Sequence, residues 1–233
     1  RVCSRMEKIC FHAAIRQVAV ALDAEETWIQ EPLDALAAVM MELCNKKRPI
    51  VYNTFQLYRS DRLAFIKQMH TLATECGYIL GAKLVRGAYM EKERKRAALM
   101  GYASPINPTK GSTDELYDHA LNYCIDHLDS FGIIVASHNE KSNLLAVRKL
   151  LENGHSLQHS HIHWSQLYGM SDNITFNLSK AGASVSKYLP FGPIEDVIPY
   201  LMRRAQENTS VKGQTGRELG LIQKELDRRR HSA

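Results

Sequence analysis

The strongest constraint on the fold of this chain is a regular alternation of short apolar runs with longer segments of helical periodicity. We interpret six apolar runs as strands: Val18–Leu22, Ile50–Asn53, Leu80–Arg86, Ile133–Ser137, His161–Trp164 and Ser184–Tyr188. Helical patterns lie near residues 26–46, 58–76, 90–101, 114–130, 140–153, 170–180 and 194–207. Because strands and helices alternate along the chain, the sequence predicts a parallel sheet whose strands are joined by crossover helices.

Two α/β architectures are compatible with this alternation, and the number of strands separates them. A TIM-type (β/α)8 barrel has eight strands. Six strands, preceded by a helical segment over residues 5–18, predict such a barrel without its first one or two βα units. An open doubly wound sheet alternates in the same way, but no G-x-G-x-x-G motif follows the first strand. We therefore expect the barrel over residues 1–213 and a C-terminal helix or tail over residues 214–233.

Composition narrows the classes of function. No run in the 233 residues approaches the roughly 18 apolar residues that a membrane-spanning helix needs, and the start shows no signal-peptide core. The five cysteines include no C-x-x-C pair, which argues against a zinc ribbon or disulfide framework and favours a reducing compartment. The formal charge of +5 is not gathered into an aromatic-interleaved basic patch, so we expect no nucleic-acid partner.

Polar residues follow the predicted strands, at the end of the sheet where α/β barrels place their sites. These residues are Asp23, Glu25, Glu26, Thr54, Gln56, the segment 86–89, the segment 137–140, Gln166 and Tyr188. Glu25 and Glu26 also open a helix, so helix capping is the simpler interpretation of both. Asp23 stands directly at a strand end, which leaves a structural and a functional role equally open.

The last helical pattern gives the sharpest chemical signal. Tyr200, the pair Arg203 and Arg204, and Glu207 share one face of that helix because they lie about one turn apart. Two guanidinium groups can bind and orient one carboxylate. The face therefore predicts a site for an anionic substrate such as an amino acid.

Four histidines, at positions 155, 159, 161 and 163, form a second cluster. A metal site is the alternative that this cluster raises. A barrel metallohydrolase would also need carboxylate ligands and histidines from other strands, and only His138 and Asp23 are candidates. We therefore expect no metal.

Six motifs agree in order with the strand-end and final-helix motifs of proline dehydrogenases. They are Val20–Glu25, Tyr52–Gln56, Lys83–Tyr89, Ala136–Asn139, Gln166–Met170 and Tyr200–Asn208. Over nearly its whole length the chain resembles this family.

The resemblance implies a (β/α) barrel that holds FAD without a covalent link and oxidises L-proline to pyrroline-5-carboxylate in proline catabolism. It also implies electron transfer to a quinone, and a location on the matrix side of the inner mitochondrial membrane with peripheral membrane contact. By position it implies substrate contacts at Arg203, Arg204, Tyr188, Tyr200, Tyr89, Leu84 and Asp23. It implies flavin contacts at Gln56, Lys83, Val85, Gly87, Ala88, His138 and Glu207.

Two alternatives stay open. Hydroxyproline dehydrogenases resemble this chain and have a smaller residue where it has Tyr188, whose phenol leaves little room for a ring hydroxyl. A truncated, inactive barrel that serves only in binding or assembly is the second alternative.

Overall fold

The structure is a computed structural model that describes the backbone of residues 1–210 and 214–231. Side chains are described for residues 1–202 and 220–231. The chain forms two compact units, of which the first comprises Arg1–Gln166 and Asp172–Ser186 and the second Leu167–Ser171 and Lys187–Ala233. The predicted boundary at residue 213 lies outside the described residues.

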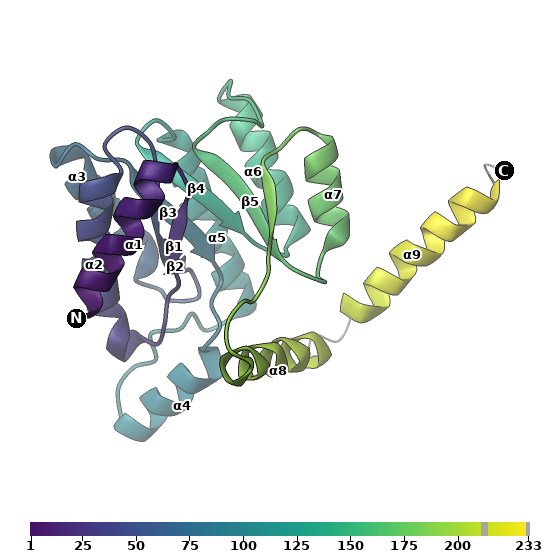
Figure 1. The fold of residues 1–233 in the computed structure, drawn as a ribbon. Coiled ribbons are helices and arrows are strands. Elements are labelled where there is room, and N and C mark those ends of the chain that lie inside the picture. Colours follow the sequence, from purple (N-terminus) through teal and green to yellow (C-terminus); the bar gives the residue numbers. More distant parts are fainter. Residues whose placement is uncertain (211–213, 232–233) are drawn as a thin grey trace. The chain divides into compact units, whose positions relative to one another are not determined.

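One six-stranded sheet organises the fold (Figure 1). Its strands are β1 Val20–Leu22, β2 Val51–Gln56, β3 Leu80–Val85, β4 Phe131–Ala136, β5 Ile162–Leu167 and β6 Val185–Tyr188. They follow one another in the sheet in chain order, and the pairs from β1 to β5 are parallel. A doubly wound sheet reverses its strand order at a switch point. The sequential order therefore confirms the barrel-type prediction and excludes the doubly wound alternative.

Nine helices occur in the described part of the chain. They are α1 Val2–Arg16, α2 Thr27–Cys44, α3 Arg62–Glu75, α4 Met90–Met100, α5 Lys110–Asp126, α6 Glu140–Glu152, α7 Asp172–Lys180, α8 Ile194–Ser210 and α9 Gln214–His231. Helix α5 begins earlier than predicted because Thr109 caps it, with the Thr109 hydroxyl accepting from the Ser112 N–H at 3.0 Å. None of the described helices is long and apolar enough to cross a bilayer.

Two strands extend further than their apolar runs predicted. Strand β2 continues to Gln56 and β5 continues to Leu167. Polar residues interrupt the apolar pattern at these strand ends, although the backbone still pairs with its neighbour. Gln56 therefore lies within a strand, and so does Gln166.

The two faces of the sheet in the first unit differ in character. Phe55, Leu84, Val135 and Trp164 are fully buried in the hydrophobic core. Leu84, Val135 and Trp164 alternate with half-buried residues along their strands, whereas every residue of β2 is buried. Helices α2, α3 and α5 pack against the sheet (Figure 1). The opposite face carries Lys83 in register with Thr54 and Ile134, because successive side chains of a strand point to opposite faces. The polar chemistry of the sheet gathers on this second face.

Candidate functional site

The carboxyl end of the sheet carries an ion pair between Lys83 and Asp23. Lys83 projects from β3 and Asp23 follows β1, so the pair spans the intervening strand β2. The Lys83 side chain is 17% exposed, whereas the Asp23 side chain is 56% exposed. The ammonium group is thus held from within the sheet, and the carboxylate lies at its accessible edge.

Gln56, at the end of β2, connects the segments that follow β1 and β3. Its side-chain Nε2 donates to the Glu25 carbonyl at 2.7 Å. The Ala88 N–H donates to Gln56 Oε1 at 3.3 Å. One amide side chain therefore fixes two of the predicted strand-end segments relative to each other.

Gly87 is required by the backbone at the end of β3. Its φ of +130° lies in a region that favours glycine, and an added Cβ would lie 2.2 Å from Cδ1 of Tyr58. The Tyr58 N–H in turn donates to the Arg86 carbonyl at 2.7 Å. Glycine at this position lets the chain turn closely over the Tyr58 ring and carry Ala88 and Tyr89 to the sheet edge.

Tyr89 is fixed by a carboxylate from the segment after β1. Its hydroxyl donates to Glu25 Oε2 at 2.7 Å. Glu26 stands at the N-cap of α2, as the helix-capping interpretation expects, but its side chain makes no capping hydrogen bond. The Thr27 N–H at the start of α2 instead donates to Glu93 Oε1 at 2.7 Å, and Glu93 belongs to α4.

Leu84 differs from its predicted role. Its side chain is fully buried in the hydrophobic core, on the face opposite Lys83 and Val85. A pocket wall needs an accessible side chain. In this structure Leu84 is therefore a core residue and not the wall of a pocket.

Arg86 has a structural environment that explains its place after β3. Its guanidinium donates to Asp114 at 2.6 Å, to Ser137 at 2.9 Å and to Ser142 at 3.0 Å. It also stacks over the Tyr117 ring at 4.4 Å from the ring centroid. These contacts tie β3 to α5 and α6, so the strand ends hold their positions.

His138 and Thr54 complete the description of this edge. His138 follows β4, next to Asn139, whose side-chain oxygen accepts from the N–H groups of Lys141 and Ser142 and caps α6. Thr54 is in register with Lys83, and its buried hydroxyl has no hydrogen-bond partner in the described part of the chain. Sequence reasoning placed Thr54 at a strand end but gave it no role. The sequence signal that could have indicated a role for Thr54 is its position two residues before Gln56, which places both side chains on the same face of β2.

In the second unit, Tyr188 and Tyr200 lie with their ring centroids 5.7 Å apart and their planes inclined at 51°. Two of the predicted pocket residues are therefore brought together. The backbone of α8 is helical through residue 210. The side chains of Arg203, Arg204 and Glu207 lie outside the described residues.

Three histidines of the cluster stay together, because the ring centroids of His155 and His161 each lie 5.2 Å from that of His159. His163 lies in β5, and its ring nitrogens contact the hydroxyls of Ser184 at 2.9 Å and Ser186 at 2.8 Å. Burial lowers the pKa of His163. No group of three potential metal ligands occurs in the part of the chain that the structure describes.

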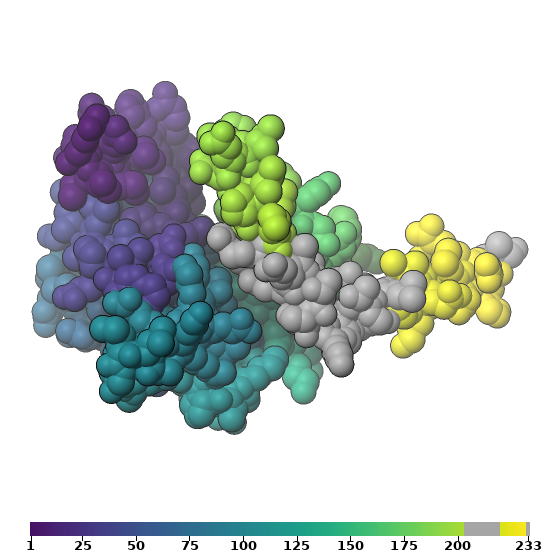
Figure 2. Space-filling view, turned by 90° about the horizontal axis from the view of Figure 1, so that it is seen from below, coloured from purple at the N-terminus to yellow at the C-terminus, as the bar shows by residue number. Residues whose placement is uncertain are grey.

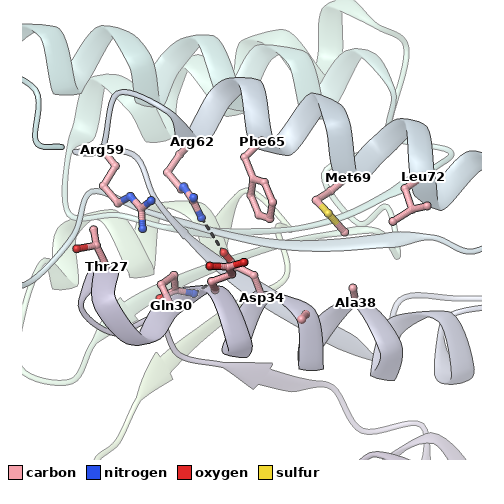
Figure 3. Close-up of a pocket in the computed structure, with 11 residues that line it drawn as sticks. Thr27, Gln30, Asp34, Ala38, Arg59, Arg62, Phe65, Met69 and Leu72 are labelled. Carbon is pink, nitrogen blue, oxygen red and sulfur yellow. Dashed lines mark hydrogen bonds and ion pairs between the residues drawn. The ribbon is translucent and has the colours of Figure 1, made fainter.

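A hollow of about 530 Å³ lies between α2 and α3 (Figure 3). Ala35, Ala38, Phe65, Met69 and Leu72 form much of its lining. Figure 3 shows Arg62 pointing toward Asp34, to which its Nη1 donates at 2.8 Å. The hollow contains none of the predicted site residues, so it is distinct from the polar edge of the sheet.

Comparison with known proteins identifies the family. The family profile described as "Proline dehydrogenase" matches residues 2–217. The chain belongs to the proline dehydrogenase family. This finding confirms the resemblance that the six motifs indicated.

Several curated members of the family are similar over almost the whole chain. "Proline dehydrogenase 1, mitochondrial" of Drosophila melanogaster is 40% identical over 97% of this chain and 34% of its own length. The Homo sapiens protein of the same name is 40% identical over 98% of the chain and 39% of its own length. "Hydroxyproline dehydrogenase" of Xenopus laevis is 39% identical over 97% of the chain and 49% of its own length. The chain thus spans about a third to a half of the length of these relatives.

Solved structures of proline utilization A share the fold. The protein from Bdellovibrio bacteriovorus matches with a TM-score of 0.83 at 22% identity, over 90% of this chain and 22% of its own. The protein from Bradyrhizobium japonicum matches with a TM-score of 0.78 at 25% identity, over 91% of this chain and 22% of its own. The α/β barrel architecture predicted for this proline dehydrogenase family member is confirmed.

The structure brings together only part of the residues that the family resemblance selected. In the first unit, Asp23 and Lys83 are in contact, and Gln56 contacts Ala88. Glu25, which was interpreted as a capping residue, contacts both Tyr89 and Gln56. A contact 64 positions away along the chain has no local sequence signal.

Proposed function

We propose that the protein catalyses the FAD-dependent oxidation of L-proline to pyrroline-5-carboxylate in proline catabolism and passes the electrons to a quinone. The observation that carries this proposal is the family match over residues 2–217. Identities near 40% to two proteins named proline dehydrogenase support it. The class of reaction is oxidation at a carbon bonded to an amine nitrogen.

The polar edge of the sheet fits a flavin. The buried Thr54 hydroxyl has no hydrogen-bond partner among the residues that the structure describes, and Thr54 is in register with Lys83 on the neighbouring strand. Gly87 brings the backbone close to this edge without a Cβ. The side chains and backbone groups that would hold FAD are those of Gln56, Lys83, Val85, Gly87, Ala88, His138 and Glu207. When bound, FAD supplies the acceptor for the hydride.

The protein's own part in the reaction is binding and orientation. Arg203 and Arg204 bind the substrate carboxylate through their guanidinium groups, each of which is planar. The further substrate contacts that the family resemblance implies are Asp23 and Tyr89 in the first unit and Tyr188 and Tyr200 in the second. Hydride leaves the ring carbon when the neighbouring amine is neutral. Hydride transfer requires no protein nucleophile. The protein therefore contributes to catalysis by positioning the substrate.

The names of several relatives support a mitochondrial setting. Proteins of Drosophila melanogaster, Homo sapiens and Caenorhabditis elegans that resemble this chain are named mitochondrial. We place this protein in mitochondria, on the matrix side of the inner membrane, where peripheral contact with the bilayer gives access to a quinone.

The test uses the intact protein, purified and examined for flavin absorbance and for proline-dependent reduction of a dye acceptor. Arg203→Met is expected to weaken a proline-like carboxylate inhibitor by about 2–5 kcal/mol, because one partner of a desolvated charge pair is lost. Arg229→Met on α9 is the matched control, since Arg229 pairs with Glu225 and is exposed. A folded protein without flavin or proline oxidation would favour a binding or assembly module instead.

Hydroxyproline oxidation is the second candidate. The 39% identity to a hydroxyproline dehydrogenase is close to the 40% identity to proline dehydrogenases, so overall similarity does not separate the substrates. The phenol of Tyr188, which packs near Tyr200, favours the unsubstituted ring.

A further inference from the structure

Three consecutive residues after β1 contact the segment that opens α4. Glu25 accepts a hydrogen bond from Tyr89, Glu26 pairs with Lys92, and the backbone and hydroxyl of Thr27 both donate to Glu93. Figure 2 shows the end of the first unit from which α4 projects. The two Thr27 bonds are 2.7 and 2.8 Å long, and Glu93 is fully buried. The segment after β1 is therefore firmly held against the start of α4.

Glu25 has more connections to the predicted site than its two neighbours. Its carboxylate accepts from the Tyr89 hydroxyl at 2.7 Å, and its carbonyl accepts from Gln56 Nε2 at 2.7 Å. Its N–H donates to Gln30 Oε1 at 2.8 Å. The carboxylate and carbonyl of Glu25 thus join Tyr89, a predicted substrate contact, to Gln56, a predicted flavin contact. The N–H of Glu25 anchors it to Gln30.

The anchor of Glu25 reaches into the buried interior. Gln30 Nε2 donates to Asp34 Oδ1 at 2.9 Å, and Asp34 is buried with Arg62. Asn53 Nδ2, on β2, also donates to Asp34 Oδ1 at 2.8 Å. Because Asp34 is fixed by three donors from α2, α3 and β2, the Glu25 backbone is fixed as well.

We propose that Glu25 is a positioning residue that sets the Tyr89 hydroxyl for substrate binding. This role rests on the proposed function. A tyrosine hydroxyl bonded to an ionised carboxylate has one preferred direction, because charge-assisted hydrogen bonds are shorter and stronger than neutral ones. Without that acceptor, the partly exposed Tyr89 ring has more freedom, and binding must restrict it. Glu25 acts through Tyr89 and does not itself touch the substrate.

The kinetic test compares Glu25→Ala with Glu25→Gln in the intact, flavin-loaded protein. Glu25→Ala is expected to raise the KM for proline about tenfold, with a smaller change in kcat. Glu25→Gln keeps an oxygen acceptor and is expected to recover most of the loss. Glu31→Gln is the matched control, because Glu31 is an exposed carboxylate of α2, whereas Glu26 pairs with Lys92, which lies over the Tyr89 ring. An unchanged KM in a folded Glu25→Ala protein would overturn the proposal.

A double-mutant comparison isolates the route through Tyr89. Tyr89→Phe removes the hydroxyl alone, so the Glu25→Ala/Tyr89→Phe protein is expected to have the KM of the Tyr89→Phe protein. If the rise in KM of the double variant equals the product of the rises in the two single variants, Glu25 does not act through Tyr89.

A readout without turnover separates this proposal from the proposed function. With 13C-labelled tyrosine, the Tyr89 resonance, assigned by its loss in Tyr89→Phe, is expected to shift in Glu25→Ala and to stay in place in Glu31→Gln. An unmoved resonance overturns the positioning role. A wild-type protein that fails to oxidise proline overturns the proposed function, whatever the resonance does.

Discussion

Lys83 and Asp23 form an ion pair across strand β2, although 60 positions separate them in the sequence. Asp23→Asn keeps the shape of the side chain and removes its charge. Because the Asp23 side chain is 56% exposed, we expect a loss of stability below about 1 kcal/mol. We expect a clear fall in the flavin-to-protein ratio, since Lys83 loses one of the groups that hold it.

Urea denaturation and flavin absorbance check this prediction. Asp126→Asn is the control, because Asp126 forms a comparably exposed ion pair with Lys149 at 2.7 Å, away from the sheet edge. Equal flavin content in both variants would contradict a cofactor role for the Lys83–Asp23 pair.

Gly87→Ala tests the close turn after β3. The added Cβ would clash with the Tyr58 ring at 2.2 Å and force alanine to a φ of +130°. We expect a loss of more than about 2 kcal/mol in the free energy of unfolding. Gly101→Ala, with a φ of +72° and no atom within 4 Å of the new Cβ, should cost only about 1 kcal/mol. Chemical denaturation of the two variants measures the difference, and similar losses would argue against the clash.

Leu84→Ala distinguishes a core residue from a pocket wall. Leu84 is fully buried, so we expect a loss of about 2–5 kcal/mol in stability. The exposed Leu99→Ala should change stability by less than about 0.5 kcal/mol. Thermal and urea unfolding give both values. A stable Leu84→Ala protein with a raised KM for proline would restore the pocket-wall role.

Asp61 should make stability depend on pH in acid. Burial alone raises its pKa, but hydrogen bonds from Arg62 and Arg59 outweigh burial and lower the pKa from 3.8 to about 2. The folded state therefore binds the proton less readily than the unfolded state. The stabilisation is complete above about pH 4 and is lost as the pH falls toward 2.

Comparison of urea unfolding at several pH values between 5 and 2 checks this sign. Asp61→Asn should remove part of the decline in stability over that interval. The energy is modest, because the Asp61 side chain is 48% exposed and water screens it. Parallel pH dependence in the two proteins would show that other groups cause the decline.

Tyr188→Ser addresses substrate choice. Loss of the phenol should weaken proline binding by about 1–3 kcal/mol, while the smaller side chain leaves space and a hydrogen-bonding group for a ring hydroxyl. The ratio of kcat/KM for proline to that for hydroxyproline is expected to fall in the variant. If the wild type already prefers hydroxyproline, or the ratio does not move, Tyr188 is not the discriminating residue.

The sequence alone determined the order of elements and the family. Hydrophobic periodicity is a local property, so the alternation of strands and helices appeared before any contact was known. The polar residues near the strand ends, such as Asp23 and Gln56, were found in the same way, whereas Lys83 was selected only by the family resemblance. All three lie at the carboxyl end of the sheet. The predicted ends of β2 and β5 were too early, because polar residues such as Gln56 and Gln166 continue these strands.

Only the tertiary structure decided which of these residues touch and which faces they occupy. Glu25 looked like a cap but contacts Tyr89, and the capping acceptor for Thr27 comes from Glu93 on another helix. Leu84 is adjacent to Lys83 in sequence but points into the core. Strands of a parallel sheet are apolar on both faces, so their sequence does not state which face meets the helices. Contacts between strand ends depend on how the strands are ordered side by side, and that order exists only in the assembled sheet.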